Sequence, residues 1–135
     1  RLSPGVDEGT HPRDLSEGQR LALVLALQLA GEPAVILLDE PTRGLDYTAK
    51  KRLSTVLSEH AARGASVFLS SHDVEFVART ADRVIVLSEG EIITNGPAHT
   101  VLTASATFAP QVARIVRPLT FLTVDEVCDA LAVAS

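Results

Sequence analysis

Apolar residues recur along this chain in two patterns, one with helical spacing and one as short continuous runs. The run LALVLALQLA at 21–30 is apolar on nearly every face and predicts a helix buried in protein. The run AVILLD at 34–39 has strand length and is typical of a parallel strand covered on both faces. SVFLS at 66–70 predicts a second strand, and the helical spacing of apolar residues between Asp46 and Gly64 predicts a helix between the two.

Polar and turn-forming residues set the predicted ends of these elements. Residues 1–14 are rich in Pro, Gly and charge and predict a loop. Ser16, three positions before Gln19, has capping-box spacing and predicts the start of the first helix. Asp46 is the predicted N-cap of the second helix, and Asp73 that of a short third one.

The C-terminal part has a hairpin pattern followed by short helical patterns. RVIVL at 83–87 and EIITN at 91–95 flank the turn sequence SEG and predict a β-hairpin. Short helices are predicted at 97–103 and 109–116. The TVDE sequence at 123–126 repeats the capping-box spacing and predicts a terminal helix.

Strands that alternate with helices predict an α/β fold with a parallel sheet. Ligands of such sheets bind beyond the carboxyl ends of the strands. Asp39 and Glu40 follow the first predicted strand, and His72 follows the second. We therefore expect these three polar side chains to converge on one edge of the sheet.

Composition narrows the class of protein. The 135 residues are 46% hydrophobic with a mean hydropathy of +0.22, which suffices for a core. Aromatic residues make up only 4% and the net charge is -5, so neither a stacking platform nor a basic patch for nucleic acid is expected. Cys128 is the one cysteine, so we expect a reducing cytosolic setting without a disulfide framework.

The acids after the first strand suggest phosphate chemistry. Buried charge is unfavourable unless it is paired or bound to a metal. Asp39 would hold Mg²⁺, largely through water, and Glu40 would polarise a water that attacks a terminal phosphate. The ordinary alternative is a strand that enters an acidic helix cap.

Two further segments point to an anion. LSEGQR at 15–20 places Ser16 and Gly18 at a helix N-terminus, where free N–H groups and the helix dipole favour phosphate. SSHD at 70–73 places His72 in the turn after a strand, where it could donate to a phosphate oxygen. An ordinary capped helix and a loop histidine bonded to backbone are the alternatives.

Together these segments resemble the ATP-binding cassette family of ATPases, in its transporter branch. LSEGQ is similar to the family signature, AVILLDE to the Walker B strand and its glutamate, PTRGLD to the D-loop and SSHD to the switch-histidine loop. The four motifs occur in the family's order, and the resemblance covers roughly residues 10–103.

The resemblance implies a role for each matching residue, with ATP and Mg²⁺ as cofactors. Asp39 would be the Mg²⁺ carboxylate, Glu40 the general base and His72 the contact to the γ-phosphate. Asp46 would link two cassettes at their interface.

The signature-like segment would contact the ATP that is bound by the opposite cassette. Its cofactor-binding residues are Ser16, Glu17, Gly18 and Gln19. Glu17 stands where the family usually has glycine, and a carboxylate would repel phosphate. We expect its side chain to point away from the nucleotide.

No phosphate-cradling G-x-x-x-x-G-K-[ST] motif occurs in the sequence. The resemblance therefore implies the C-terminal half of a cassette: a partial P-loop three-layer sandwich with parallel strands, a C-terminal β-hairpin and a helical tail, without the Walker A strand. We assign residues 1–103 to this half-domain and 104–135 to a helical extension. Alone, the chain is expected to bind ATP weakly or not at all and not to hydrolyse it, and its uncovered strand edges are expected to cause self-association, strand exchange or a rearranged sheet.

PTRGLDYTAK and the tail segments FAPQVARI and FLTVDEV are similar to ATPase subunits of energy-coupling factor and cobalt-type importers. This implies vitamin or metal-ion import, a second cassette and a transmembrane subunit as partners, no nucleic acid, and a place on the cytoplasmic face of the membrane. The alternatives are a soluble ATPase of the same family in DNA maintenance or translation, and a non-catalytic interaction module.

Overall fold

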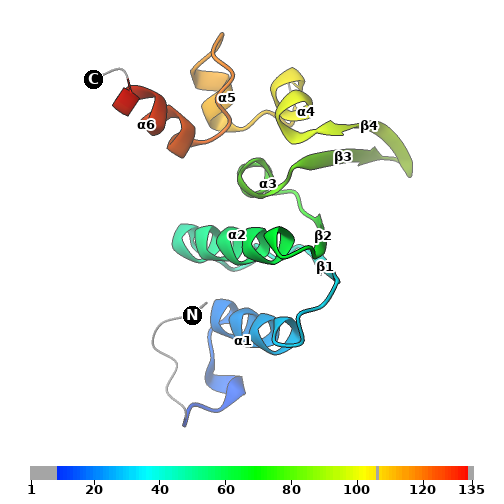
Figure 1. Ribbon diagram of the computed structural model, residues 1–135, viewed down its shortest axis with the longest axis vertical. Coiled ribbons are helices and arrows are strands. Elements are labelled where there is room, and N and C mark those ends of the chain that lie inside the picture. The colour runs from blue at the N-terminus through cyan, green and yellow to red at the C-terminus, as the bar shows by residue number, and fades with distance from the viewer. Residues whose placement is uncertain (1–8, 106, 134–135) are drawn as a thin grey trace. The chain divides into compact units, whose positions relative to one another are not determined.

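The computed structural model describes residues 9–105 and 107–133 (Figure 1). The elements, in chain order, are the 3₁₀ helix η1 (Pro12–Asp14), α1 (Glu17–Leu29), β1 (Val35–Asp39), α2 (Tyr47–Ala62), β2 (Ser66–Ser70), α3 (Val74–Thr80), β3 (Arg83–Ser88), β4 (Glu91–Pro97), α4 (Ala98–Ala104), α5 (Gln111–Ile115) and α6 (Val124–Val133). Strands alternate with helices up to β3, so the predicted α/β class is confirmed.

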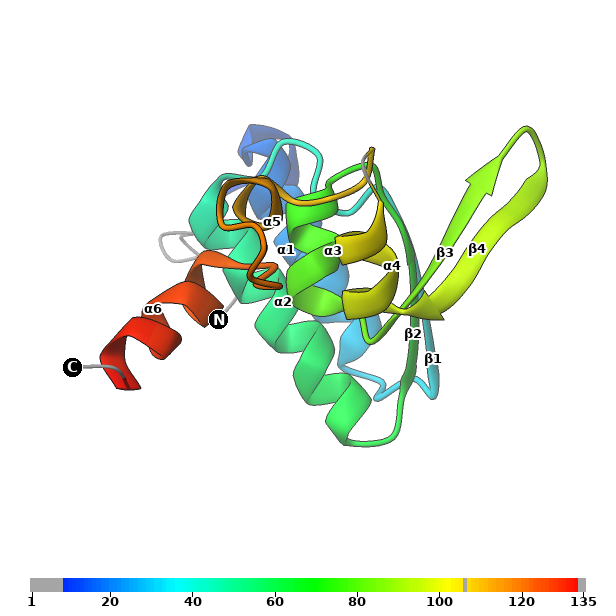
Figure 2. The same cartoon turned by 90° about the horizontal axis from the view of Figure 1, so that it is seen from above.

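The chain divides into two compact units, Arg1–His72 and Asp73–Ser135. In the first unit β1 and β2 pair in parallel, with register partners from Val35↔Ser66 to Asp39↔Ser70 (Figure 2). The parallel pairing confirms the expectation drawn from the two apolar runs. The buried apolar side chains of the helices and strands in this unit are Leu25, Leu29, Ile36, Leu53 and Leu57.

The predicted helix caps form at α1 and α2. The Gln19 N–H donates to Ser16 Oγ at 3.2 Å, and the Ser16 N–H donates to Gln19 Oε1 at 2.9 Å. The Asp46 carboxylate accepts from the Ala49 N–H at 2.7 Å. Each cap satisfies N–H groups that have no partner within the helix, which fixes where the helix begins.

Two burial predictions for this unit are wrong. The helix over 21–30 is not buried on every face, because Val24 and Leu27 are 53% and 70% exposed. β1 is covered on one face only: Ile36 is buried, whereas Leu37 is 74% exposed. Apolar composition shows what a segment can bury, but the described chain supplies partners for only one side of α1 and one side of β1.

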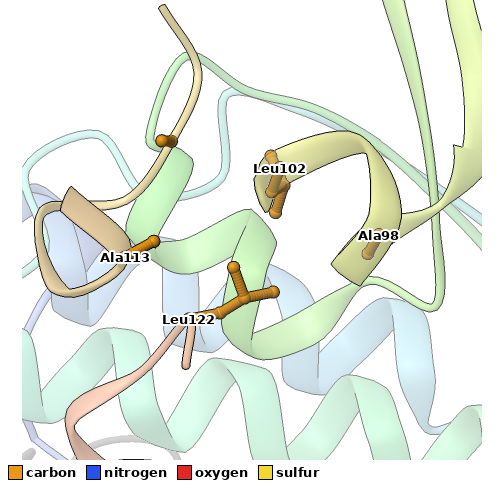
Figure 3. Close-up of a cluster of buried hydrophobic side chains, with 5 residues drawn as sticks. Ala98, Leu102, Ala113 and Leu122 are labelled. Carbon is orange, nitrogen blue, oxygen red and sulfur yellow. The ribbon is translucent and has the colours of Figure 1, made fainter. Parts of the chain in front are cut away.

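In its described residues, the second unit contains a hairpin and four short helices. β3 and β4 pair antiparallel, with a register shift between Val86 and Leu87, as the hairpin pattern predicted. A hydrophobic cluster joins α4 and α5 to the segment before α6 (Figure 3). Its buried members are Ala98, Leu102, Ala109, Ala113 and Leu122.

The terminal helix is fixed by polar contacts in addition to that cluster. The Glu126 N–H donates to Thr123 Oγ1, and the Thr123 N–H donates to Glu126 Oε2, both at 3.3 Å, which confirms the second capping box. Arg79 of α3 forms a 2.5 Å ion pair with Asp125. The tail therefore packs on α3 and α4 within its own unit.

The remaining predictions differ from the structure in detail or are not tested by it. Residues 1–8 of the predicted N-terminal loop lie outside the described residues, and Pro12–Asp14 form a 3₁₀ helix instead of loop. The short helices predicted at 97–103 and 109–116 are α4 and α5, the latter shorter than expected. The assignment of 1–103 and 104–135 to two functional regions stays a prediction.

Candidate functional site

The carboxyl ends of β1 and β2 bring the predicted strand-end residues together. Asp39 and Ser70 are register partners at the last position of the two strands. Just beyond them, the Glu40 N–H donates to the Ser70 carbonyl at 2.9 Å. The parallel pairing therefore continues one step into the turn and sets Asp39 and Glu40 directly beside the segment that leads to His72.

His72 contacts the Glu40 carboxylate through both backbone and side chain. Its N–H donates to Glu40 Oε1 at 3.2 Å, and its ring Nδ1 lies 2.9 Å from Oε2. The His72 side chain is 87% exposed and the Glu40 side chain 36% exposed. The prediction that Asp39, Glu40 and His72 gather at one edge of the sheet is confirmed. The His72 ring faces solvent, whereas Glu40 Oε2, which it contacts, is itself buried.

Glu40 has an uncommon backbone conformation. Its φ is +45°, a left-handed value that costs a non-glycine residue about 1–2 kcal/mol. The Arg43 N–H donates to the Glu40 carbonyl at 3.2 Å, so hydrogen bonds on both sides of the residue hold it there. Strained residues of this kind cluster at functional sites.

The Asp39 carboxylate is exposed and oriented by one neighbour. The Ser70 hydroxyl donates to Asp39 Oδ1. Asp39 Oδ2 has no hydrogen bond to any described residue. One carboxylate oxygen is thus held in place while the other remains open to a ligand.

This donor set fits Mg²⁺ bound together with a nucleotide. In the described part of the chain, no group of three or more His, Cys, Asp and Glu side chains could hold a metal alone. Mg²⁺ does not need such a group, since it is usually held by one or two carboxylates, waters and substrate phosphates. The exposed Asp39 carboxylate could serve as that protein ligand.

The start of α1 forms a second cluster with the turn before α2. A Cβ placed on Gly44, where φ is +71°, would lie 2.6 Å from Glu17 Oε2. A Cβ on Gly18 would lie 3.1 Å from Leu45 Cδ2. Glu17 and Gly18 at the start of α1 therefore lie against Gly44 and Leu45 of the turn that leads to Asp46.

Sequence reasoning missed Ser70 and Gly44. Ser70 belongs to the SSHD segment, but only His72 was singled out there. The signal was present: strands of equal length in parallel register place the last residue of one beside the last residue of the other. The Glu17–Gly44 contact has no such signal, because it depends on how α1 packs against the turn.

Among the described residues, no helix has both the length and the apolar character needed to cross a bilayer.

Comparison with a family of known proteins gives a match over residues 1–78, to the family described as "AAA domain, putative AbiEii toxin, Type IV TA system". That match covers more than half of the chain.

Curated relatives match more of the chain. A putative ABC transporter ATP-binding protein of Streptomyces avermitilis is 56% identical over 131 residues, covering 97% of this chain and 23% of the relative. The cobalt import ATP-binding protein CbiO of Rhodobacter capsulatus is 42% identical over 103 residues, covering 76% of this chain and 36% of the relative. The chain thus spans about a quarter of the length of the first relative.

Solved structures share the fold. CbiO1 of Clostridium perfringens, described as part of an ABC transporter complex, superposes with a TM-score of 0.62 at 29% identity, covering 79% of this chain and 42% of its own. A dimeric ATP-binding cassette in a post-hydrolysis state, bound to ADP and Pi, gives a TM-score of 0.60 at 27% identity, covering 69% and 41%.

Proposed function

The chain belongs over residues 1–78 to the AAA-domain family whose sequence model it matches, and through its relatives to the ATP-binding cassette ATPases; on this premise we propose that the full-length protein hydrolyses ATP to drive a membrane transporter. The chain is part of such an ATPase domain and has its α/β fold. The observation that carries the proposal is the contact of His72 with both oxygens of the Glu40 carboxylate, beside the open Asp39 carboxylate.

Each residue of this edge has a distinct part in the proposed reaction. Asp39 would hold Mg²⁺, which when bound neutralises charge on the phosphates. Glu40 would accept a proton from the attacking water, a task for which a carboxylate must lie within hydrogen-bond reach of that water. His72, whose ring is exposed, would donate to the γ-phosphate and hold the Glu40 carboxylate in line.

The second cluster would act on a nucleotide held by another cassette. Ser16, Gly18 and Gln19 lie at the start of α1, where the helix dipole favours an anion. The packing of Glu17 against Gly44 supports the expectation that its carboxylate turns from the nucleotide. Asp46, at the start of α2, would lie at the cassette interface.

The proposed partners are a second cassette and a transmembrane subunit, at the cytoplasmic face of the membrane. The dimeric cassette bound to ADP and Pi supports the first, and the CbiO1 structure, part of a transporter complex, supports the second. Metal-ion or vitamin import is the finer proposal, supported by the name of the cobalt import relative and by the tail segments FAPQVARI and FLTVDEV.

Purification of the full-length protein from membranes tests the proposal. We expect it to copurify with an integral membrane protein and to hydrolyse Mg-ATP. ATP hydrolysis without a membrane partner would favour a soluble ATPase of the same family. Failure to bind ATP at all would favour a non-catalytic interaction module.

The isolated 135-residue chain provides a further test. It has no phosphate-cradling glycine-rich loop in its sequence, so we expect no measurable ATP turnover from it. Turnover by the purified chain that disappears in Glu40→Gln would contradict this expectation.

A further inference from the structure

Ser70 hydrogen-bonds to both strand-end acids, Asp39 and Glu40, through different groups. Its hydroxyl donates to Asp39 Oδ1, and its carbonyl accepts from the Glu40 N–H at 2.9 Å. The first contact belongs to the side chain and the second to the backbone. A substitution at Ser70 can therefore remove the hold on Asp39 and leave the hold on Glu40.

The strand register explains why Ser70 is suited to this task. Asp39 and Ser70 face each other at the last step of the parallel pair, so their side chains project from the same face of the sheet. Ser66 lies on the same face at the opposite end of β2, beside Val35. Ser66 therefore serves as a matched control for Ser70, because it lies on the same strand and face but far from Asp39 and Glu40.

The effect of the Ser70 hydroxyl on Asp39 follows from its geometry. An exposed carboxylate rotates unless a neighbour holds it, and this one has a single held oxygen. Groups that hydrogen-bond to a metal-binding carboxylate orient it, and losing them typically weakens metal affinity about 10–100-fold. The hydroxyl leaves Oδ2 open for the cation.

We propose that Ser70 is a positioning residue that orients the Asp39 carboxylate for the divalent cation of the nucleotide site. The inference rests on the proposed function, since it takes Asp39 as the cation ligand. Ser70 does not contact the cation, and its contribution is to fix one carboxylate oxygen so that the other points outward.

Metal binding by the full-length protein tests this role, with Mn²⁺ as the probe and a non-hydrolysable ATP analogue present. Electron paramagnetic resonance measures free Mn²⁺ during the titration. We expect Ser70→Ala to raise the Mn²⁺ dissociation constant about tenfold, while the affinity for the analogue without metal is unchanged. Ser66→Ala, the matched control, should bind Mn²⁺ like the wild type.

Two variants with side chains of the same shape, Ser70→Thr and Ser70→Val, distinguish the effect of the hydroxyl on Mn²⁺ affinity from the effect of packing. Ser70→Thr keeps the hydroxyl and should bind Mn²⁺ like the wild type, whereas Ser70→Val has the same shape without it and should match Ser70→Ala. Both residues favour a strand, so the pair remains informative if Ser70→Ala fails to fold. Equal Mn²⁺ affinity of the Thr and Val variants would overturn the inference.

Asp39→Asn distinguishes failure of this inference from failure of the proposed function. If Asp39→Asn loses Mn²⁺ while Ser70→Ala and Ser70→Val retain it, Ser70 has no positioning role and the proposed function stands. If Asp39→Asn also retains Mn²⁺, Asp39 is not the cation ligand, and the nucleotide site proposed above is wrong along with the role of Ser70.

Discussion

Two residues in the turn after β1 adopt left-handed backbone conformations, which surrounding hydrogen bonds maintain at Glu40 and which glycine adopts readily at Gly44. Glu40 has φ +45° and Gly44 has φ +71° within the same turn. Glu40 is held there by its hydrogen bond to the Ser70 carbonyl, which also brings its carboxylate to His72. Gly44 avoids the conformational penalty, and its missing side chain makes room for Glu17.

Substitution of Gly44 tests this account of the turn. Gly44→Ala should destabilise the chain by at least about 1 kcal/mol, chiefly from the positive φ, with a smaller part from displacing the exposed Glu17 side chain, which the new Cβ would meet. The double variant with Glu17→Ala should regain the smaller part, because the contact is removed, but should keep the φ penalty. Urea unfolding of the four forms measures both parts, and a strictly additive cycle would refute the contact.

The helices and strands differ in which of their features the sequence predicts. Helix starts were predicted to the residue at Ser16 and Asp46, because a cap is a local hydrogen bond between neighbours in the chain. The exposed sides of α1 and β1 were not predicted, because burial depends on partners distant in sequence. Convergence of the acids with His72 was predictable from parallel topology, whereas the role of Ser70 required the observed register.

Substitutions of Asp46 distinguish its role as the N-cap of α2 from its proposed role at the cassette interface. Asp46→Ala removes the acceptor for the Ala49 N–H and should destabilise the chain by about 1 kcal/mol. Asp46→Asn keeps an acceptor oxygen and should nearly preserve stability. Thermal unfolding measures both variants.

In the full-length protein, the same Asn variant addresses the cassette interface. We expect ATP-dependent association to weaken although α2 stays capped. Unchanged association, measured by analytical ultracentrifugation with ATP, would argue that Asp46 serves only as a helix cap.

At the scale of the whole molecule, the strands form two separate two-stranded sheets in the described residues. One face of the β1–β2 pair presents Val35, Leu37 and Phe68, which are 55%, 74% and 62% exposed. Exposed apolar surface and unpaired strand edges favour association with another chain. This agrees with the sequence-based expectation of uncovered strands, although self-association itself stays a prediction.

Sedimentation of the isolated chain over a range of concentrations measures that prediction. We expect the chain to self-associate, and Leu37→Thr with Phe68→Thr to shift it towards monomer while preserving strand propensity. Ile115→Thr, at an 80% exposed position of α5, is the control and should have little effect. A wild-type chain that stays monomeric at high concentration would contradict the prediction.

The central claim is that Glu40 activates the water that attacks ATP in the full-length protein. The most direct measurement is phosphate release from radiolabelled ATP by the wild type and Glu40→Gln, with Glu59→Gln on α2 as a control for loss of an acid. General-base catalysis contributes typically about 10²–10⁴-fold, so Glu40→Gln should bind ATP as the wild type does and release phosphate at least about 100-fold more slowly. Phosphate release at the wild-type rate from Glu40→Gln would contradict the claim.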